Sequence, residues 1–140
     1  ACENIDLANI ISDTICEIDK DLIYLVPTGS KMETSANSFG LKVASEIFAD
    51  RNYLDDGNLI SRKESNALIT DPVEAREHVL FMVKNQALRC LSGKQIPCNI
   101  DSVCIHGDTT RSLEIAKIVK NNLIDNGFEL KPLNKMKKFL

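Results

Sequence analysis

The sequence lacks several features that mark common protein classes. Its five cysteines include no Cys-x-x-Cys pair, so they form neither a zinc-knuckle pattern nor an obvious disulfide framework, and a reducing compartment fits them best. No apolar run is long enough to span a bilayer, and no signal segment opens the chain. The 17 basic residues do not outnumber the 20 acidic ones, and the net charge is -3. We therefore expect a cytoplasmic protein that binds neither nucleic acid nor membrane.

The composition is that of an ordinary globular protein, with 44% hydrophobic and 26% charged residues among 140. A chain of this length can bury about two-thirds of the surface that its unfolded form exposes, which is enough for one core. No internal repeat or low-complexity tract interrupts it. We therefore expect one domain over residues 1–130, followed by a basic, solvated C-terminal tail over residues 131–140.

The pattern of apolar residues predicts the order helix, strand, helix, strand, long loop, helix, strand, helix. The predicted helices cover residues 6–18, 31–39, 71–85 and 108–127, the predicted strands cover residues 22–26, 42–49 and 102–106, the loop covers residues 50–65, and a small hairpin falls within residues 89–97. Parallel neighbouring strands need crossover connections, so this alternation predicts an α/β layer or partial barrel with parallel strands and outer helices.

Local signals predict where individual elements begin and how they are buried. Asp6 is a good N-cap for the first helix, and Asp71 with Pro72 predicts the start of the third. Either Asp108 or Thr109 is expected to cap the last helix. The continuous apolar run 22–26 predicts a strand buried on both faces. The positions that share one face of the first helix are Leu7, Ile10, Ile11, Thr14, Ile15 and Ile18.

Two carboxylates share one face of the strand that ends near Ala49. Side chains alternate along a strand, so Glu46, Phe48 and Asp50 are expected to point the same way. An unpaired charge inside a buried strand is costly, and Arg51 is the nearest candidate to neutralise Glu46. The segment fits a functional acid pair and a structural ion pair about equally well.

A second group of polar residues follows the last predicted strand. His106-Gly107-Asp108-Thr109 lies where a strand ends and a helix begins, which is where α/β folds bind ligands. Gly107 permits close backbone approach, and the amides of a helix start can hold a phosphate or carboxylate. A histidine that caps a turn is the structural alternative, but the context favours function.

The remaining reactive residues receive structural interpretations. His78 lies on a predicted helix beside apolar and charged neighbours and is interpreted as structural or exposed. Cys104 is interpreted as a small buried cysteine, because no base adjoins it in the sequence. The Thr-Gly-Ser-Lys segment at 28–31 lacks the spacing of a phosphate-binding loop.

Several ordered blocks of the sequence resemble the LamB/YcsF family. The blocks are Glu46-Ile47-Phe48-Ala49-Asp50-Arg51-Asn52-Tyr53, Gly57-Asn58-Leu59 with Arg62, Ala67-Leu68-Ile69 with Asp71-Pro72, and Asp101-Ser102-Val103-Cys104-Ile105-His106-Gly107-Asp108. The resemblance runs from near Ala1 to about Gly127 and implies a portion of a divergent (β/α) barrel of the glycoside hydrolase/deacetylase type. The family's N-terminal motifs are absent and the sequence opens on Ala1, so we expect this chain to be the C-terminal part of such a domain.

The resemblance also implies an activity. It implies that the chain is the A subunit of an ATP-dependent 5-oxoprolinase, which opens the lactam of 5-oxo-L-proline to L-glutamate while ATP is hydrolysed. ATP would be a co-substrate and Mg²⁺ its accompanying ion. The expected partners are 5-oxoprolinase subunits B and C, the missing N-terminal part of the barrel, and a small-molecule substrate.

Under this resemblance the polar residues take roles in catalysis and binding. His106 and Asp108 would handle protons or position the attacked carbonyl, while Glu46 and Asp50 would bind Mg²⁺ or orient arginines. Phosphate or the substrate carboxylate would be bound by a set consisting of Arg51, Arg62, Tyr53, Gly107 and Thr109. The identity of any metal ligand stays open.

Two alternatives remain open from the sequence. One is a metal-dependent amidase or deacetylase-like hydrolase, in which a histidine and carboxylates bind an ion that activates water. The other is a noncatalytic truncated or scaffold segment whose exposed barrel edge binds another polypeptide.

Overall fold

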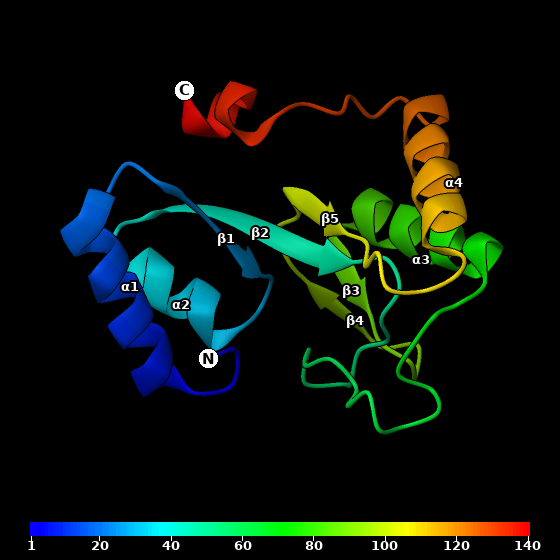
Figure 1. Ribbon diagram of the computed structural model, residues 1–140, viewed down its shortest axis with the longest axis horizontal. Coiled ribbons are helices and arrows are strands. Elements are labelled where there is room, and N and C mark those ends of the chain that lie inside the picture. Colours follow the sequence, from blue (N-terminus) through cyan, green and yellow to red (C-terminus); the bar gives the residue numbers. More distant parts are fainter. The chain divides into compact units, whose positions relative to one another are not determined.

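The computed structural model describes residues 1–140 and places helices and strands in the predicted order (Figure 1). The helices are α1 (Ile5–Asp19), α2 (Lys31–Ser38), α3 (Pro72–Asn85) and α4 (Ser112–Asp125), followed by two short 3-10 helices, η1 (Leu133–Lys135) and η2 (Lys137–Phe139). The strands are β1 (Ile23–Pro27), β2 (Lys42–Phe48), β3 (Ala87–Arg89), β4 (Gln95–Pro97) and β5 (Ser102–Cys104).

The strands form two sheets. One has the order β1-β2-β5, with β1 and β2 parallel, and the other is the antiparallel hairpin of β3 and β4. The parallel pair is connected through α2, which is the crossover that parallel neighbours require. These features confirm the predicted α/β class and the predicted hairpin.

The chain divides into two compact units. Unit 1 comprises Ala1–Glu46, Ile100–Ser102 and Lys131–Leu140, and unit 2 comprises Ile47–Asn99 and Val103–Leu130. The predicted boundary between a domain over residues 1–130 and a tail over 131–140 stays a prediction. Within unit 1, the basic C-terminal segment is held by an ion pair between Lys138 and Asp101, so Lys138 is not simply solvated. None of the helices is long and apolar enough to cross a lipid bilayer.

Unit 1 has an apolar cluster to which β1, α2 and β2 contribute. The buried residues of this cluster are Val26, Ala36, Leu41 and Val43. The prediction that β1 is buried on both faces is wrong, because Leu25 is 40% exposed while Val26 is fully buried. β1 lies at one edge of its sheet, so it has a neighbouring strand on one side only.

Helix α1 packs beside α2 and begins one residue earlier than predicted (Figure 1). The predicted cap, Asp6, is wrong. Asn4 has extended backbone and accepts a hydrogen bond from the Leu7 amide at 3.0 Å, so it is the N-cap, whereas Asp6 lies inside the first turn. The helix buries its small residues Ala8 and Ser12 rather than its large apolar ones.

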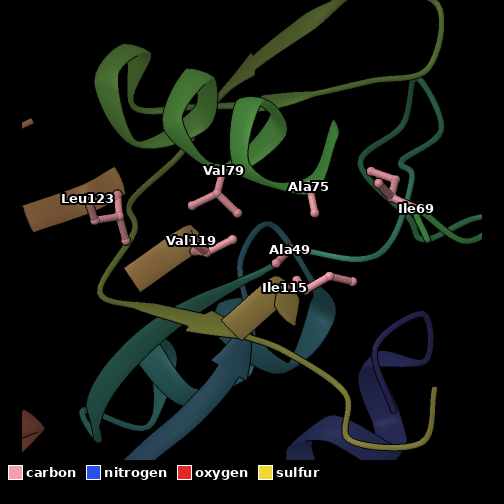
Figure 2. Packing of buried hydrophobic residues seen from close by; sticks show 7 residues of the cluster. All are labelled: Ala49, Ile69, Ala75, Val79, Ile115, Val119 and Leu123. Atoms are coloured by element: carbon pink, nitrogen blue, oxygen red, sulfur yellow. The ribbon is translucent and has the colours of Figure 1, made fainter. Parts of the chain in front are cut away.

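Unit 2 is built around an apolar cluster between α3 and α4. Figure 2 shows its buried residues, which are Ala49, Ile69, Ala75, Val79, Ile115, Val119 and Leu123. Val103 and Ile105 also pack against this cluster, as the alternation of side chains along β5 predicted. The cluster thereby holds the start of the loop that follows β2 close to the end of β5 within the same unit.

The ends of α3 were predicted correctly and the start of α4 was not. Asp71 caps α3 by accepting hydrogen bonds from the amides of Val73 and Glu74 at 2.9 and 3.0 Å, with Pro72 in the first turn. α4 begins at Ser112 with no side-chain cap. Neither Asp108 nor Thr109 caps it, because the Asp108 carboxylate binds an arginine and the Thr109 hydroxyl bonds the Ser112 hydroxyl at 2.8 Å.

Candidate active site

The candidate site lies in unit 2 at the short segment Phe48–Tyr53, which leaves β2 and enters the long loop. Main-chain hydrogen bonds hold this segment in place. The Asp50 carbonyl accepts from the Ile69 amide at 3.0 Å, and the Asn52 amide donates to the Ala67 carbonyl at 3.1 Å. The Ala49 amide donates a hydrogen bond to the Cys104 carbonyl at 2.9 Å, so the segment is also bonded to the last residue of β5. Asp50 and His106 are thereby brought together.

Asp50 and His106 form a close pair. The Nδ1 atom of His106 lies 2.8 and 2.9 Å from the two carboxylate oxygens of Asp50, and the His106 amide donates to the same carboxylate at 3.2 Å. The Asp50 side chain is 7% exposed and the His106 side chain 26% exposed. A carboxylate on Nδ1 favours the tautomer with its proton on that nitrogen and leaves Nε2 as the acceptor. The pair is therefore arranged as an oriented imidazole base.

The ring of Phe48 also holds the imidazole of His106, and Tyr53 supports Phe48. The ring of Phe48 stacks on His106 with centroids 5.7 Å apart and planes inclined by 13°. The Phe48 amide in turn donates to the Tyr53 hydroxyl at 2.8 Å. Tyr53 is 3% exposed and so supports the segment from inside. This placement leaves its predicted role in substrate binding as a prediction only.

Arg51 is buried and ties the segment to the loop. It is 7% exposed, and its Nη2 donates to the Ile60 carbonyl at 2.6 Å, while its buried Nε has no partner. Burial lowers the pKa of the guanidinium, and the nearby charge of Arg62 acts in the same direction. The anion-binding role predicted for Arg51 stays a prediction.

Arg62 and Asp108 form an ion pair at the surface of unit 2. Their closest atoms, Nη1 and Oδ2, are 3.3 Å apart, and the side chains are 50% and 60% exposed. The hydrogen bond from Arg62 is the main cause that lowers the pKa of Asp108. Exposed pairs of this kind exchange partners at little cost, so both groups are accessible to a charged substrate.

The other predicted site residues are placed as follows. Gly107 has open space where a side chain would extend, and Thr109 bonds the first residue of α4. Glu46 belongs to unit 1, where its carboxylate accepts a hydrogen bond from the Ser102 hydroxyl at 3.1 Å. The binding roles predicted for Gly107 and Thr109 and the catalytic role predicted for Glu46 therefore stay predictions.

The sequence interpretation did not predict that His78 is buried and lines a cleft. His78 lies on α3 and is 3% exposed, so the exposed alternative is excluded and the structural interpretation stays a prediction. It lines a cleft of about 140 Å³ together with Asn52, Glu74, Glu77, Arg89, Cys90 and Leu91. This cleft contains none of the residues predicted to be catalytic. The signal that could have identified His78 is a polar residue among the inward positions of α3, next to Val79 and Met82.

The side chains of the site do not fit a resident metal ion. No three His, Cys, Asp or Glu side chains lie close enough together to hold one. The Asp50 oxygens are engaged by His106, and the Asp108 oxygen Oδ2 by Arg62. The donor set of this chain is therefore unsuited to a metal held by protein ligands alone.

Comparisons with known proteins point to one group. The pattern of the LamB/YcsF family matches residues 1–138. The A subunit of 5-oxoprolinase from Clostridium beijerinckii is 40% identical over 136 residues, which are 97% of this chain and 53% of that protein. The A subunit from Pyrococcus horikoshii is 37% identical over 135 residues, or 96% and 52%.

A solved structure agrees with these matches. The crystal structure of a lactam utilization protein from Thermus thermophilus superposes with a TM-score of 0.81 at 32% identity, covering 93% of this chain and 51% of that one. The chain thus spans about half the length of the relatives that it matches.

Proposed function

The chain belongs to the LamB/YcsF family, and on this basis we propose that it is part of the A subunit of an ATP-dependent 5-oxoprolinase. The proposed reaction opens the cyclic amide of 5-oxo-L-proline to L-glutamate as ATP is hydrolysed. Two relatives that match nearly all of this chain are named as A subunits of 5-oxoprolinase, and a structural neighbour is called a lactam utilization protein.

The observation that carries the proposal is the Asp50–His106 pair. Both carboxylate oxygens of Asp50 lie within 2.9 Å of His106 Nδ1, so the ring is oriented and Nε2 is the nitrogen that can accept a proton. Opening an amide with water requires removal of a proton from the attacking water and delivery of a proton to the leaving nitrogen. We assign both transfers to His106 Nε2, with Asp50 stabilising the imidazolium in between.

ATP hydrolysis suits the chemistry of the substrate. An unstrained amide carbonyl is a poor electrophile, and transfer of the terminal phosphoryl group of ATP to its oxygen would make the carbon susceptible to attack. Water could then add to that carbon, and a proton delivered to the ring nitrogen would let the C–N bond break to leave an amine and an acyl phosphate. A second water would hydrolyse the acyl phosphate to the carboxylate of glutamate and inorganic phosphate. The roles of this chain in such a step are to orient the carbonyl and to move protons.

Charged residues beside the pair suit the anionic parts of the substrates. We propose that Arg62 leaves Asp108 to bind the substrate carboxylate or a phosphate, since both side chains are at least half exposed. Gly107 and Thr109 would offer main-chain approach to the same anion, and Arg51 would add positive charge from inside. Asp108 would then be released to assist with protons.

Tyr53 is proposed to act in support of these residues, and the role predicted for Glu46 stays a prediction. Mg²⁺ would enter with ATP, whose phosphates supply most of its ligands, because this chain assembles no metal site by itself. No observation favours a metal-dependent amidase or deacetylase-like hydrolase over this proposal.

Assembly is part of the proposal. We propose that the chain forms a portion of a divergent (β/α) barrel of the glycoside hydrolase/deacetylase type, completed by an N-terminal part, and works with subunits B and C in the cytoplasm. The relatives are about twice as long as this chain. Leu7, Ile10 and Ile18 on α1 are 45%, 64% and 73% exposed, and an apolar helix face of this kind is suited to burial against another polypeptide. A noncatalytic scaffold role would share these contacts but would not need the Asp50–His106 pair.

The test is replacement of His106 in the assembled complex. The His106→Ala variant is expected to lower 5-oxoproline-dependent phosphate release by about 10²- to 10⁴-fold, the range for loss of a general acid–base group. Asp13→Asn, at an exposed position on α1, is the control and should leave the rate unchanged. If His106→Ala retains the full rate, His106 has no part in the reaction.

A further inference from the structure

His78 is a buried histidine that the proposed mechanism does not use. Its ring makes a hydrogen bond to the main chain of Arg51, and its Nε2 is buried without a partner. The bonded ring atom is therefore Nδ1. Burial lowers the pKa of His78 to about 4, so the ring is neutral near pH 7, and Nδ1 carries the proton that it donates to the Arg51 carbonyl.

The Arg51 carbonyl lies at the centre of the segment Phe48–Tyr53. The residues on either side are held by the loop, through the Asp50 carbonyl and the Asn52 amide. His78 supplies a bond from α3 between these two. The segment is therefore fixed to the helical core of unit 2 at the residue that follows Asp50.

A second contact leads from His78 to the same site. The ring of Tyr53 stacks on His78 with centroids 6.1 Å apart and planes inclined by 22°. The Tyr53 hydroxyl accepts the amide proton of Phe48, and Phe48 stacks on His106. Two short series of contacts thus connect the buried histidine with the candidate base.

We propose that His78 is a positioning residue. By holding the Arg51 carbonyl and the Tyr53 ring, it fixes the positions of the Asp50 carboxylate and the His106 imidazole. The inference deepens the proposed function, because it concerns the geometry of the same pair. His78 itself touches neither His106 nor substrate in this role. Its effect passes through the segment Phe48–Tyr53.

A matched pair of substitutions separates the hydrogen bond from the volume of the side chain. Asn and Leu have nearly the same shape, but His78→Asn keeps a donor at the position of Nδ1 and His78→Leu does not. His78→Leu leaves the Arg51 carbonyl buried without a donor, which favours a shift of the segment. Leu123→Ala on α4 is the control for general loss of packing, since Leu123 belongs to the buried apolar cluster of unit 2 but lies outside the segment and outside α3.

The first measurement is ¹⁵N NMR of the imidazole rings in the 140-residue chain, which contains only two histidines. In the unchanged chain and in His78→Asn, His106 should show the tautomer protonated at Nδ1 and a slowly exchanging Nδ1 proton. In His78→Leu that proton should exchange about tenfold faster or more, as the bond to Asp50 opens. Leu123→Ala should keep the His106 signals of the unchanged chain.

The second measurement is 5-oxoproline-dependent phosphate release by the assembled complex. His78→Leu should lower kcat by about tenfold to 100-fold with little change in KM, as expected for misplacement of a base, and His78→Asn should restore most of the rate. Unchanged His106 signals in His78→Leu, or equal effects of His78→Leu and Leu123→Ala on them, overturn the inference. The NMR result stands even if the complex has no such activity, so failure of the proposed function is distinguishable.

Discussion

Acidification should destabilise unit 2 through His78. The ring is buried and neutral in the folded chain, and burial together with the charge of Arg89 lowers its pKa from 6.5 to about 4, against a raising effect of the hydrogen bond to Arg51. Between pH 6.5 and 4 the unfolded chain therefore binds a proton that the folded chain does not. The free energy of unfolding must fall as the pH falls through this range.

The size of the effect follows from the two pKa values. A shift from 6.5 to about 4 corresponds to about 3 kcal/mol once the pH is below both values, and to about 2 kcal/mol at pH 5. Domains of this size are usually stable by about 5–15 kcal/mol, so the loss is a large part of the total. Above pH 6.5 the contribution of His78 is almost fully present.

The assay is urea unfolding followed by circular dichroism from pH 7.5 to 4.5, for the unchanged chain and for His78→Asn. Asn does not titrate, so the difference between the two curves isolates His78 from the carboxylates, including Glu74 and Glu77 in the adjacent cleft, and from His106. The stability of His78→Asn should depend less steeply on pH below 6.5. Parallel pH profiles for the two proteins would refute the burial argument.

Two further predictions concern other parts of unit 2. Ile115→Ala removes a side chain that is 2% exposed in the apolar cluster and should lower the free energy of unfolding by about 2–5 kcal/mol in urea titrations; a smaller loss would mean that the cluster closes around the cavity. Arg62→Ala removes the main cause of the low pKa of Asp108, so an NMR titration should find that pKa raised toward its ordinary value while the urea midpoint hardly moves; an unchanged Asp108 titration would show that the ion pair is not formed in solution.

Periodicity and turn residues were enough to predict the order of the elements. The N-cap of α3 could be read from Asp71 and Pro72 because both signals are local. The start of α4 could not, because Asp108 is drawn away by Arg62, which lies 46 positions earlier in the chain. The burial of α1 was equally unreadable, since the helix packs through Ala8 and Ser12 and leaves its larger apolar residues exposed.

For the candidate site, the sequence predicted which residues take part better than it predicted which side chains contact one another. The strand ends predicted Asp50 and His106 as candidate site residues, and the structure brings the two side chains into contact. The anion-binding role of Arg51 stays a prediction, and the bond from its buried side chain to the Ile60 carbonyl was not predicted. The bond from His78 to Arg51 is a long-range contact between a helix and a loop, and no local pattern indicates it.

The segment between Phe48 and Tyr53 has one more consequence, for how this family can vary. Main-chain bonds fix its register against residues 60–69 of the loop, against Leu91 and against Cys104, and in this register Asp50 and Phe48 contact His106. Inserting one residue before Asp50 would shift its carboxylate away from the imidazole while leaving every original side chain present. Evolution can therefore exchange side chains around this stretch more easily than it can change the number of residues in it.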